Sequence, residues 1–116
     1  MRSRADAEPF TTADGSTIRV LLDADAGGAR NQSLAEATLA PGQATERHYH
    51  AKTEELYVVL AGAGDMEVDG ERRRLGPGDA VLLPPGAWHQ IRADDEELRF
   101  LCCCAPPYRH EDTYFS

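Results

Sequence analysis

The sequence lacks spaced cysteine pairs and long apolar runs. Its three cysteines, Cys102, Cys103 and Cys104, are adjacent, so they cannot form the separated pairs of a disulfide framework, and we expect reduced thiols. The longest charge-free stretch near the middle, Leu56–Gly64, is about half as long as a membrane-spanning helix. Residues Met1–Phe10 contain no apolar run of the kind found in a secretory signal. These absences predict a cytoplasmic protein without a membrane span.

Basic residues are also scarce. The 116 residues include 12 Lys and Arg against 20 Asp and Glu, which gives a formal net charge of −8. Binding to phosphate backbones depends on Lys and Arg, so we expect no nucleic-acid partner. A chain of this length buries roughly 65% of its unfolded surface, which suffices for one core. We therefore predict a single domain over residues 1–116, with a flexible N-terminus at residues 1–10.

Glycine and proline recur every eight to twelve residues from Asn31 onward, with short alternating or apolar runs between them. This pattern is typical of an all-β protein. The runs predict strands at Ile18–Leu22, Leu34–Leu39, Thr45–His50, Glu55–Leu60, Gly64–Val68, Glu71–Leu75, Ala80–Leu83, Trp88–Ile91 and Leu98–Cys104.

Two local signals refine this pattern. Asp69-Gly70 lies between two predicted strands, and this dipeptide is typical of a two-residue hairpin turn because both positions accept φ > 0. Ser33 and Glu36 match a helix capping box, but Pro41-Gly42 would end that helix after two turns. We therefore favour a strand at Leu34–Leu39.

Two of the four histidines, His48 and His50, are separated by one residue in a predicted strand. Side chains at i and i+2 project from the same face, so both imidazoles point to one place. Glu54 and Glu55 follow at the start of the next apolar run, and His89 lies further along. Imidazoles with one carboxylate form a borderline site for Zn, Fe, Mn, Ni, Co or Cu. The residues alone leave open which glutamate takes part.

The spacing of these residues follows a two-part pattern. The first part runs from Gly42 through five residues to His48-x-His50, then four residues to Glu55 and six to Gly62. The second part runs from Gly78 through five residues to Pro84-x-Gly86, then two residues to His89. In this order, with fifteen residues between them, the two parts resemble the two signature motifs of the cupin family.

The resemblance implies a fold and a set of ligands. Cupins fold as a double-stranded β-helix, a jelly roll whose two antiparallel sheets close into a conical barrel, here at about residues 17–105. The implied cofactor is one divalent transition metal ion (Zn, Fe, Mn, Ni or Cu) with open coordination positions. Glu55 rather than Glu54 has the six-residue spacing to Gly62. Ala93 stands where the family often has an Asn that is not a ligand, so this departure leaves the implied site intact. The implied metal ligands are His48, His50, Glu55 and His89.

Further side chains carry alternative interpretations. Tyr57 shares the parity of Glu55 and belongs either to the core or to the cavity wall, where it is a candidate catalytic hydrogen-bond donor or weak acid. Cys102 and Cys104 share one face of the last predicted strand and either pack as small hydrophobes or approach the metal. His110 follows that strand, and we expect it at the surface.

Three hypotheses of function follow from the resemblance. The favoured one is a metalloenzyme that acts on a small polar, sugar-derived or phenolic molecule, as a dioxygenase or as an isomerase or lyase. The alternatives are a non-catalytic module that binds or senses a small ligand through the metal, and a metal that only stabilises the barrel. The resemblance and the edge strands of a small barrel also predict a homodimer formed by sheet pairing.

Overall fold

The computed structural model describes residues 1–116 and consists of strands and two short 3-10 turns. The strands are β1 (Phe10–Thr11), β2 (Thr17–Leu22), β3 (Ser33–Leu39), β4 (His48–His50), β5 (Glu54–Ala61), β6 (Gly64–Val68), β7 (Glu71–Leu75), β8 (Ala80–Leu83), β9 (His89–Ala93), β10 (Leu98–Ala105) and β11 (Thr113–Phe115). The 3-10 turns are η1 (Arg4–Asp6) and η2 (His110–Asp112). Neither turn has the length or hydropathy that a membrane-crossing helix needs.

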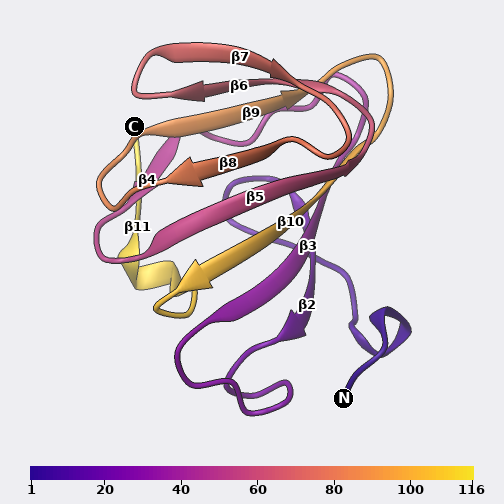
Figure 1. Cartoon of the computed structure of the whole chain (residues 1–116), viewed down its shortest axis with the longest axis vertical. Helices are drawn as coiled ribbons and strands as arrows, with labels where there is room; N and C mark the ends of the chain where they lie inside the picture. Colours follow the sequence, from indigo (N-terminus) through magenta and orange to yellow (C-terminus); the bar gives the residue numbers. More distant parts are fainter.

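The strands form two antiparallel sheets (Figure 1). One sheet has six strands in the order β1-β2-β3-β10-β5-β8, and the other has five in the order β11-β4-β9-β6-β7. Strands far apart in the sequence, such as β3 and β10, are hydrogen-bonded neighbours along their whole length. Long connections of this kind are typical of a jelly roll. The predicted all-β jelly-roll fold is confirmed.

Most of the nine predicted strands appear within one or two residues of their expected ends. The segment with the capping-box signal is a strand, β3, as favoured from the sequence. The prediction was too long at Thr45–His50, where only His48–His50 is a strand, and β9 begins at His89 rather than Trp88. Strands β1 and β11 were not predicted, since two- and three-residue strands show no periodicity.

Alternating side chains build the core between the sheets. Along β5, Tyr57 and Val59 are buried while Leu56 and Val58 face outward. Fully burying one large apolar side chain stabilises the fold by about 1.5–3 kcal/mol. The buried core residues come from both sheets and are Ala37, Leu39, Tyr57, Val59, Met66, Leu75, Leu83, Ile91, Ala93, Leu98 and Phe100.

The core fills one end of the barrel, and the other end is hollow. Strand β10 places Phe100 in the core, and its later inward residues, Cys102 and Cys104, line a cavity. Strand β5 follows the same course from Val59 in the core to Glu55 on the cavity wall. The inner faces of the neighbouring strands β5 and β10 therefore carry core residues at one end of the barrel and cavity-lining polar residues at the other.

Two turns show why particular residues are needed. Asp69 and Gly70 join β6 to β7 with φ of 48° and 86°, the positive values that a two-residue hairpin turn requires, as predicted. Gly62 also has a positive φ, of 80°, and a Cβ there would collide with the backbone oxygen of Glu97. Glycine at position 62 thus lets β5 turn into β6 against the neighbouring loop.

Both ends of the chain contact the barrel, including the N-terminal residues that were expected to be flexible. In η1, the Arg4 guanidinium donates to both oxygens of Glu36 on β3, at 3.0 and 2.9 Å. Ala7 is buried, and its carbonyl accepts from Arg19 on β2. At the other end, β11 pairs with β4, which carries His48 and His50. The C-terminal strand β11 therefore lies beside β4, the strand that carries two of the candidate ligands (Figure 1).

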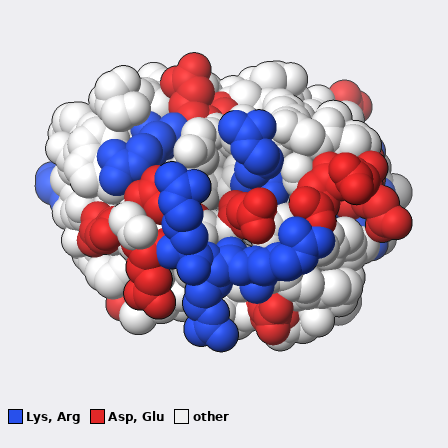
Figure 2. All heavy atoms as spheres, turned by 90° about the horizontal axis from the view of Figure 1, so that it is seen from above, with Lys and Arg blue, Asp and Glu red and all other residues white.

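Charges of both signs share the surface. Figure 2 shows a band of Lys and Arg side chains on one face, with acidic side chains on either side of it. Several arginines of the five-stranded sheet and its loops are paired with acids: Arg74 contacts Asp65 and Asp94, and Arg47 contacts Glu67. Acidic neighbours therefore partly neutralise the arginine clusters.

Candidate metal centre

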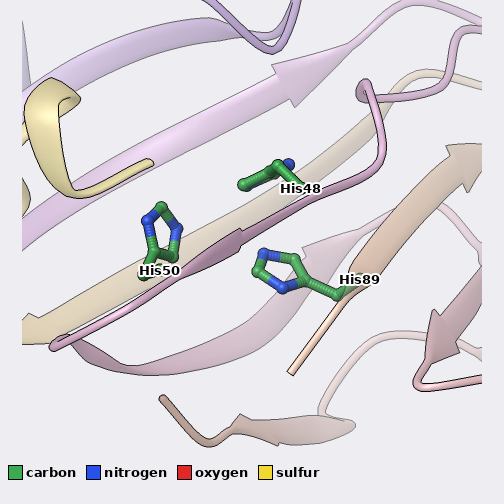
Figure 3. Close-up of side chains that lie close together, drawn as sticks. All are labelled: His48, His50 and His89. Carbon is green, nitrogen blue, oxygen red and sulfur yellow. The ribbon is translucent and has the colours of Figure 1, made fainter. Parts of the chain in front are cut away.

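Three histidines meet inside the barrel (Figure 3). His48 and His50 occupy alternate positions of β4 and project from its inner face. His89, the first residue of β9, is the cross-strand partner of His48. Sheet register thus brings His89 to the same place as the His-x-His pair, although 38 residues lie between His50 and His89 in the sequence.

The three imidazoles are close enough to hold one ion. One ring nitrogen of each lies within 4.8 Å of those of the other two. The ring centroids are 4.3 Å apart for His48 and His89, 5.1 Å for His48 and His50, and 5.6 Å for His50 and His89. All three side chains are at least 96% shielded from solvent, since their residues are 2%, 4% and 1% exposed.

Backbone carbonyls fix the tautomers of two of these rings. The Nδ1 atom of His48 lies 2.6 Å from the oxygen of Glu46, and that of His89 lies 3.0 Å from the oxygen of Ala87. A carbonyl only accepts, so each Nδ1 carries the proton and donates. Each Nε2 then keeps a free lone pair, which is the form that binds metal.

A hydroxyl from the C-terminal strand does the same for His50. Its Nδ1 lies 3.1 Å from Oγ1 of Thr113, and that hydroxyl donates its single proton to the carbonyl of Arg109 at 3.1 Å. Thr113 Oγ1 must therefore accept from His50 Nδ1, and the neutral tautomer of His50 then carries its lone pair on Nε2. No pattern in the sequence indicates this role of Thr113, because the residue belongs to β11, one of the two strands that were not predicted.

Glu55 approaches the histidines from the facing sheet. Its Oε1 atom lies 3.2 Å from Nε2 of His50 and 3.7 Å from Nε2 of His89. The Oε1 atom and Nε2 of His89 are buried without any hydrogen-bond partner. Two acceptors that face each other without a proton between them are costly in a buried site, and a cation removes that cost. The residues present therefore fit a divalent metal ion.

The structure separates the two adjacent glutamates. Glu55 is buried at 5% exposure, whereas Glu54, the first residue of β5, faces outward. Glu55 lies outside the group of ligand atoms that are all within 4.8 Å of one another, which contains only the three histidines. Of the two glutamates, Glu55 is nevertheless the one whose carboxylate contacts the histidines, through Nε2 of His50 and of His89.

Ionisation matches the needs of a metal site. Burial lowers the pKa of His89 to about 4, and the neighbouring His48 adds to this effect, so the ring is neutral at pH 7. Burial favours a raised pKa for the Glu55 carboxyl, but the imidazoles of His50 and His89 and the thiol of Cys104 hold its pKa below the ordinary value. A neutral imidazole thus lies next to an ionised carboxylate, and both are in their metal-binding forms.

Tyr57 belongs to the core and also lines the cavity. Its ring packs against Phe100 at a centroid distance of 4.7 Å and meets His89 edge-on at 6.1 Å. Burial, together with the charge of Glu55, raises the pKa of the Tyr57 hydroxyl well above its ordinary value. The hydroxyl therefore keeps its proton and can donate a hydrogen bond.

The thiols of Cys102 and Cys104 both line the cavity. Burial raises the pKa of each thiol, and the charge of Glu55 raises both further. The Sγ atom of Cys104 lies 3.2 Å from Oε2 of Glu55 and donates to it. Neither thiol belongs to the group of close ligand atoms. His110, in η2, is exposed at the surface, as expected.

The cavity beside the histidines has a volume of about 110 Å³. Of its 21 lining residues 12 are hydrophobic, including Phe10, Phe100 and Phe115, and none is Lys or Arg. His48, His50 and Glu55 form part of the wall, while His89 is more deeply buried. Cavities of roughly 150 Å³ lined by apolar groups hold benzene in other proteins, so a single small ring matches this one in scale.

Residues 35–104 match the cupin domain family (Cupin_2), and the chain belongs to that family. The recognition made from the two motifs is therefore confirmed. Because members of one fold carry unrelated chemistries, the family alone does not define a reaction.

The curated relatives include proteins with and without a described activity. An uncharacterised protein of Methanocaldococcus jannaschii, MJ1618, is 42% identical over 91% of this chain and 86% of its own length. Protein SchB of Streptomyces halstedii is 30% identical over 87% of this chain and 74% of its own. Gentisate 1,2 dioxygenase 1 of Aquipseudomonas alcaligenes is 36% identical over 51% of this chain and only 17% of its own.

Solved structures share the whole fold. A Streptomyces Pac13 variant with uridine superposes with a TM-score of 0.83 at 16% identity, over 100% of this chain and 89% of that one. A protein from Planctomyces limnophilus gives a TM-score of 0.84 at 26% identity, over 99% and 95% of the two chains. At 16% identity the likeness to Pac13 concerns the fold alone.

Proposed function

We propose that this protein is a metalloenzyme that acts on a small uncharged phenolic molecule, with dioxygen as co-substrate. The observation that carries the proposal is the meeting of three lone-pair-bearing histidines and Glu55 beside an apolar cavity. The likeness to a gentisate dioxygenase, although confined to 17% of that protein, supports the same class of reaction.

The proposed metal ligands are His48, His50, Glu55 and His89. A bound divalent ion of Fe, Mn, Ni or Cu would supply redox chemistry with dioxygen, whereas Zn would act as a Lewis acid. The acceptors beside Nδ1 select the tautomer of each imidazole that carries its lone pair on Nε2, and the lowered pKa of Glu55 keeps its carboxylate ionised, so the donor set is arranged before the ion arrives. Such preorganisation favours tight binding.

Tyr57 is the proposed hydrogen-bond donor of the cavity. It lines the same wall as Glu55, and its raised pKa keeps the hydroxyl protonated as a hydrogen-bond donor. In this position its hydroxyl would donate a hydrogen bond to an oxygen of the substrate and orient the ring. The phenyl rings of Phe100 and Phe115 exclude water from the same space.

The lining favours one of the substrate classes predicted from the sequence. A sugar phosphate needs cationic partners, and the cavity contains no Lys or Arg but does contain Asp14 and Asp23. An uncharged phenol places its hydroxyl among the polar groups and its ring against the apolar ones. The cavity therefore supports the phenolic substrate over the sugar phosphate.

The first experiment measures metal and oxygen together. Protein purified without a histidine tag is analysed for metal, loaded with Fe²⁺ and tested for oxygen uptake with catechol and hydroquinone, and with glucose 6-phosphate as the anionic control. We expect near-stoichiometric metal in the wild type, its loss in His50→Ala, and oxygen uptake with a phenol only. Retention of full metal by His50→Ala would contradict the ligand assignment. Micromolar binding of phenols without turnover under any metal would favour the non-catalytic binding module.

Two further predictions concern partner and location. Leu56, Val58, Leu60 and Leu82 form an outward apolar patch on β5 and β8 and are 36–53% exposed, which supports the proposed homodimer. The three cysteines are free, which suits the reducing cytoplasm.

A further inference from the structure

Of the three consecutive cysteines, one contacts a proposed metal ligand. Cys104 is 2% exposed and lies directly opposite Glu55 in the register between β10 and β5. Its thiol donates to Oε2 of Glu55 at 3.2 Å. Cys103 faces the other side of the strand and contacts Gln32 at 3.7 Å, so the contact with Glu55 is specific to one position.

The two oxygens of Glu55 have different partners. Oε2 accepts from the thiol, whereas Oε1 has no hydrogen-bond partner and lies within 3.7 Å of Nε2 of both His50 and His89. The terminal torsion of a glutamate rotates broadly when nothing holds it. The thiol of Cys104 is the only side chain that donates a hydrogen bond to this carboxylate.

We infer that Cys104 is a positioning residue for the metal centre: its thiol holds Glu55 so that a single oxygen, Oε1, is offered to the metal. This inference rests on the proposed role of Glu55 as a ligand. In this role Cys104 neither binds the metal through its sulfur nor serves only as a packed core residue. Groups that orient metal ligands change metal affinity by about 10- to 100-fold when they are removed.

The test measures Co²⁺ binding, because the visible absorption of Co²⁺ reports both its affinity and its coordination. We expect Cys104→Ala to weaken Co²⁺ binding by about 10- to 100-fold and to change the visible spectrum, since the freed carboxylate can rotate. Cys104→Ser retains a donor and should restore both properties. Cys103→Ala removes a thiol from the outer face of the same strand and should bind Co²⁺ as the wild type does. Thermal unfolding of each metal-free variant measures any general loss of fold.

A double-mutant cycle separates this inference from the proposed function. In a Glu55→Ala background, Cys104→Ala should have no further effect on Co²⁺ affinity, because the thiol acts only through the carboxylate. If Cys104→Ala lowers Co²⁺ affinity equally in the wild-type and the Glu55→Ala backgrounds, the inference is overturned. It is also overturned if Glu55→Ala weakens Co²⁺ binding while Cys104→Ala leaves both affinity and spectrum unchanged. If Glu55→Ala itself leaves Co²⁺ binding unchanged, Glu55 is not a ligand, and both the inference and the proposed ligand set are overturned.

Discussion

His50 takes its orientation from Thr113, 63 residues further along the chain. We expect Thr113→Val to weaken metal binding by about 10- to 100-fold, because Nδ1 of His50 loses its acceptor and the ring is free to turn or change tautomer. Valine has almost the same shape and favours strands, so β11 should persist. Isothermal titration with Zn²⁺ measures the change.

Matched variants identify the cause of that loss. Thr113→Ser keeps the hydroxyl and should bind metal as the wild type does. Thr17→Val makes the same exchange at an exposed position on β2 and should have no effect. Equal Zn²⁺ affinity of Thr113→Val and the wild type would show that the hydroxyl does not orient His50.

Among single residues, the sequence identified the histidines and the glutamate but not their supports. The spacing of His48 and His50 suffices to place both on one face of a strand, and the two-part motif added His89 and Glu55. The carbonyls of Glu46 and Ala87 and the hydroxyl of Thr113 could not be predicted, because hydrogen-bond partners depend on how the chain returns to the same point in space.

At the scale of elements, the N-terminal turn η1 is tied to β3 by an ion pair that depends on pH. The hydrogen bond from Arg4 holds the pKa of Glu36 below its ordinary value of 4.5, against the opposite effect of burial. Because the folded-state pKa is the lower one, the carboxylate contributes stability above about pH 4.5, and that contribution is lost as the pH falls through the folded-state pKa.

We therefore expect Glu36→Gln to melt at a lower temperature than the wild type at pH 7, with a smaller difference at pH 3. Thermal unfolding followed by circular dichroism measures both. Glu54→Gln makes the same exchange at an outward-facing position of β5 and should match the wild type at both pH values. A difference that is as large at pH 3 as at pH 7 would mean that the ion pair is not its source.

Element prediction succeeded where the pattern was periodic and failed at the short ends. Strands β5, β6 and β10 alternate inward and outward side chains, and the Asp69-Gly70 turn has a conformation that few dipeptides adopt. Strands β1 and β11 exist because β2 and β4 offer them hydrogen-bonding edges, which is a property of the assembled sheets.

At the scale of the whole molecule, the exposed apolar patch of β5 and β8 is the expected interface of the proposed dimer. Leu56 and Leu82 are cross-strand partners, and both project outward, at 44% and 53% exposure. We expect Leu82→Glu to convert a dimer into a monomer, because a buried unpaired carboxylate is costly at an interface. Sedimentation velocity at several concentrations measures the mass.

The control for this variant lies elsewhere on the surface. Leu22 on β2 is 38% exposed and outside the patch, so Leu22→Glu should remain a dimer. A wild type that sediments as a monomer at all concentrations would contradict the proposed dimer.

The sequence by itself determined the family, the all-β fold and the residues most suited to bind metal. Those properties follow from local rules: alternation along a strand, glycine at positive φ, and the fixed spacing of histidine, glutamate and glycine in two short motifs. Each rule acts within a few residues, so it can be applied without knowing where the rest of the chain lies.

Only the tertiary structure decided how the site is supported and which residues line its cavity. Glu55 faces the histidines from the opposite sheet, Cys104 reaches Glu55 across the register of β5 and β10, and Thr113 reaches His50 from the last strand. The absence of Lys and Arg from the cavity is likewise a property of the folded wall and not of any segment. These contacts join residues that are distant in sequence, and closing the barrel is what brings them together.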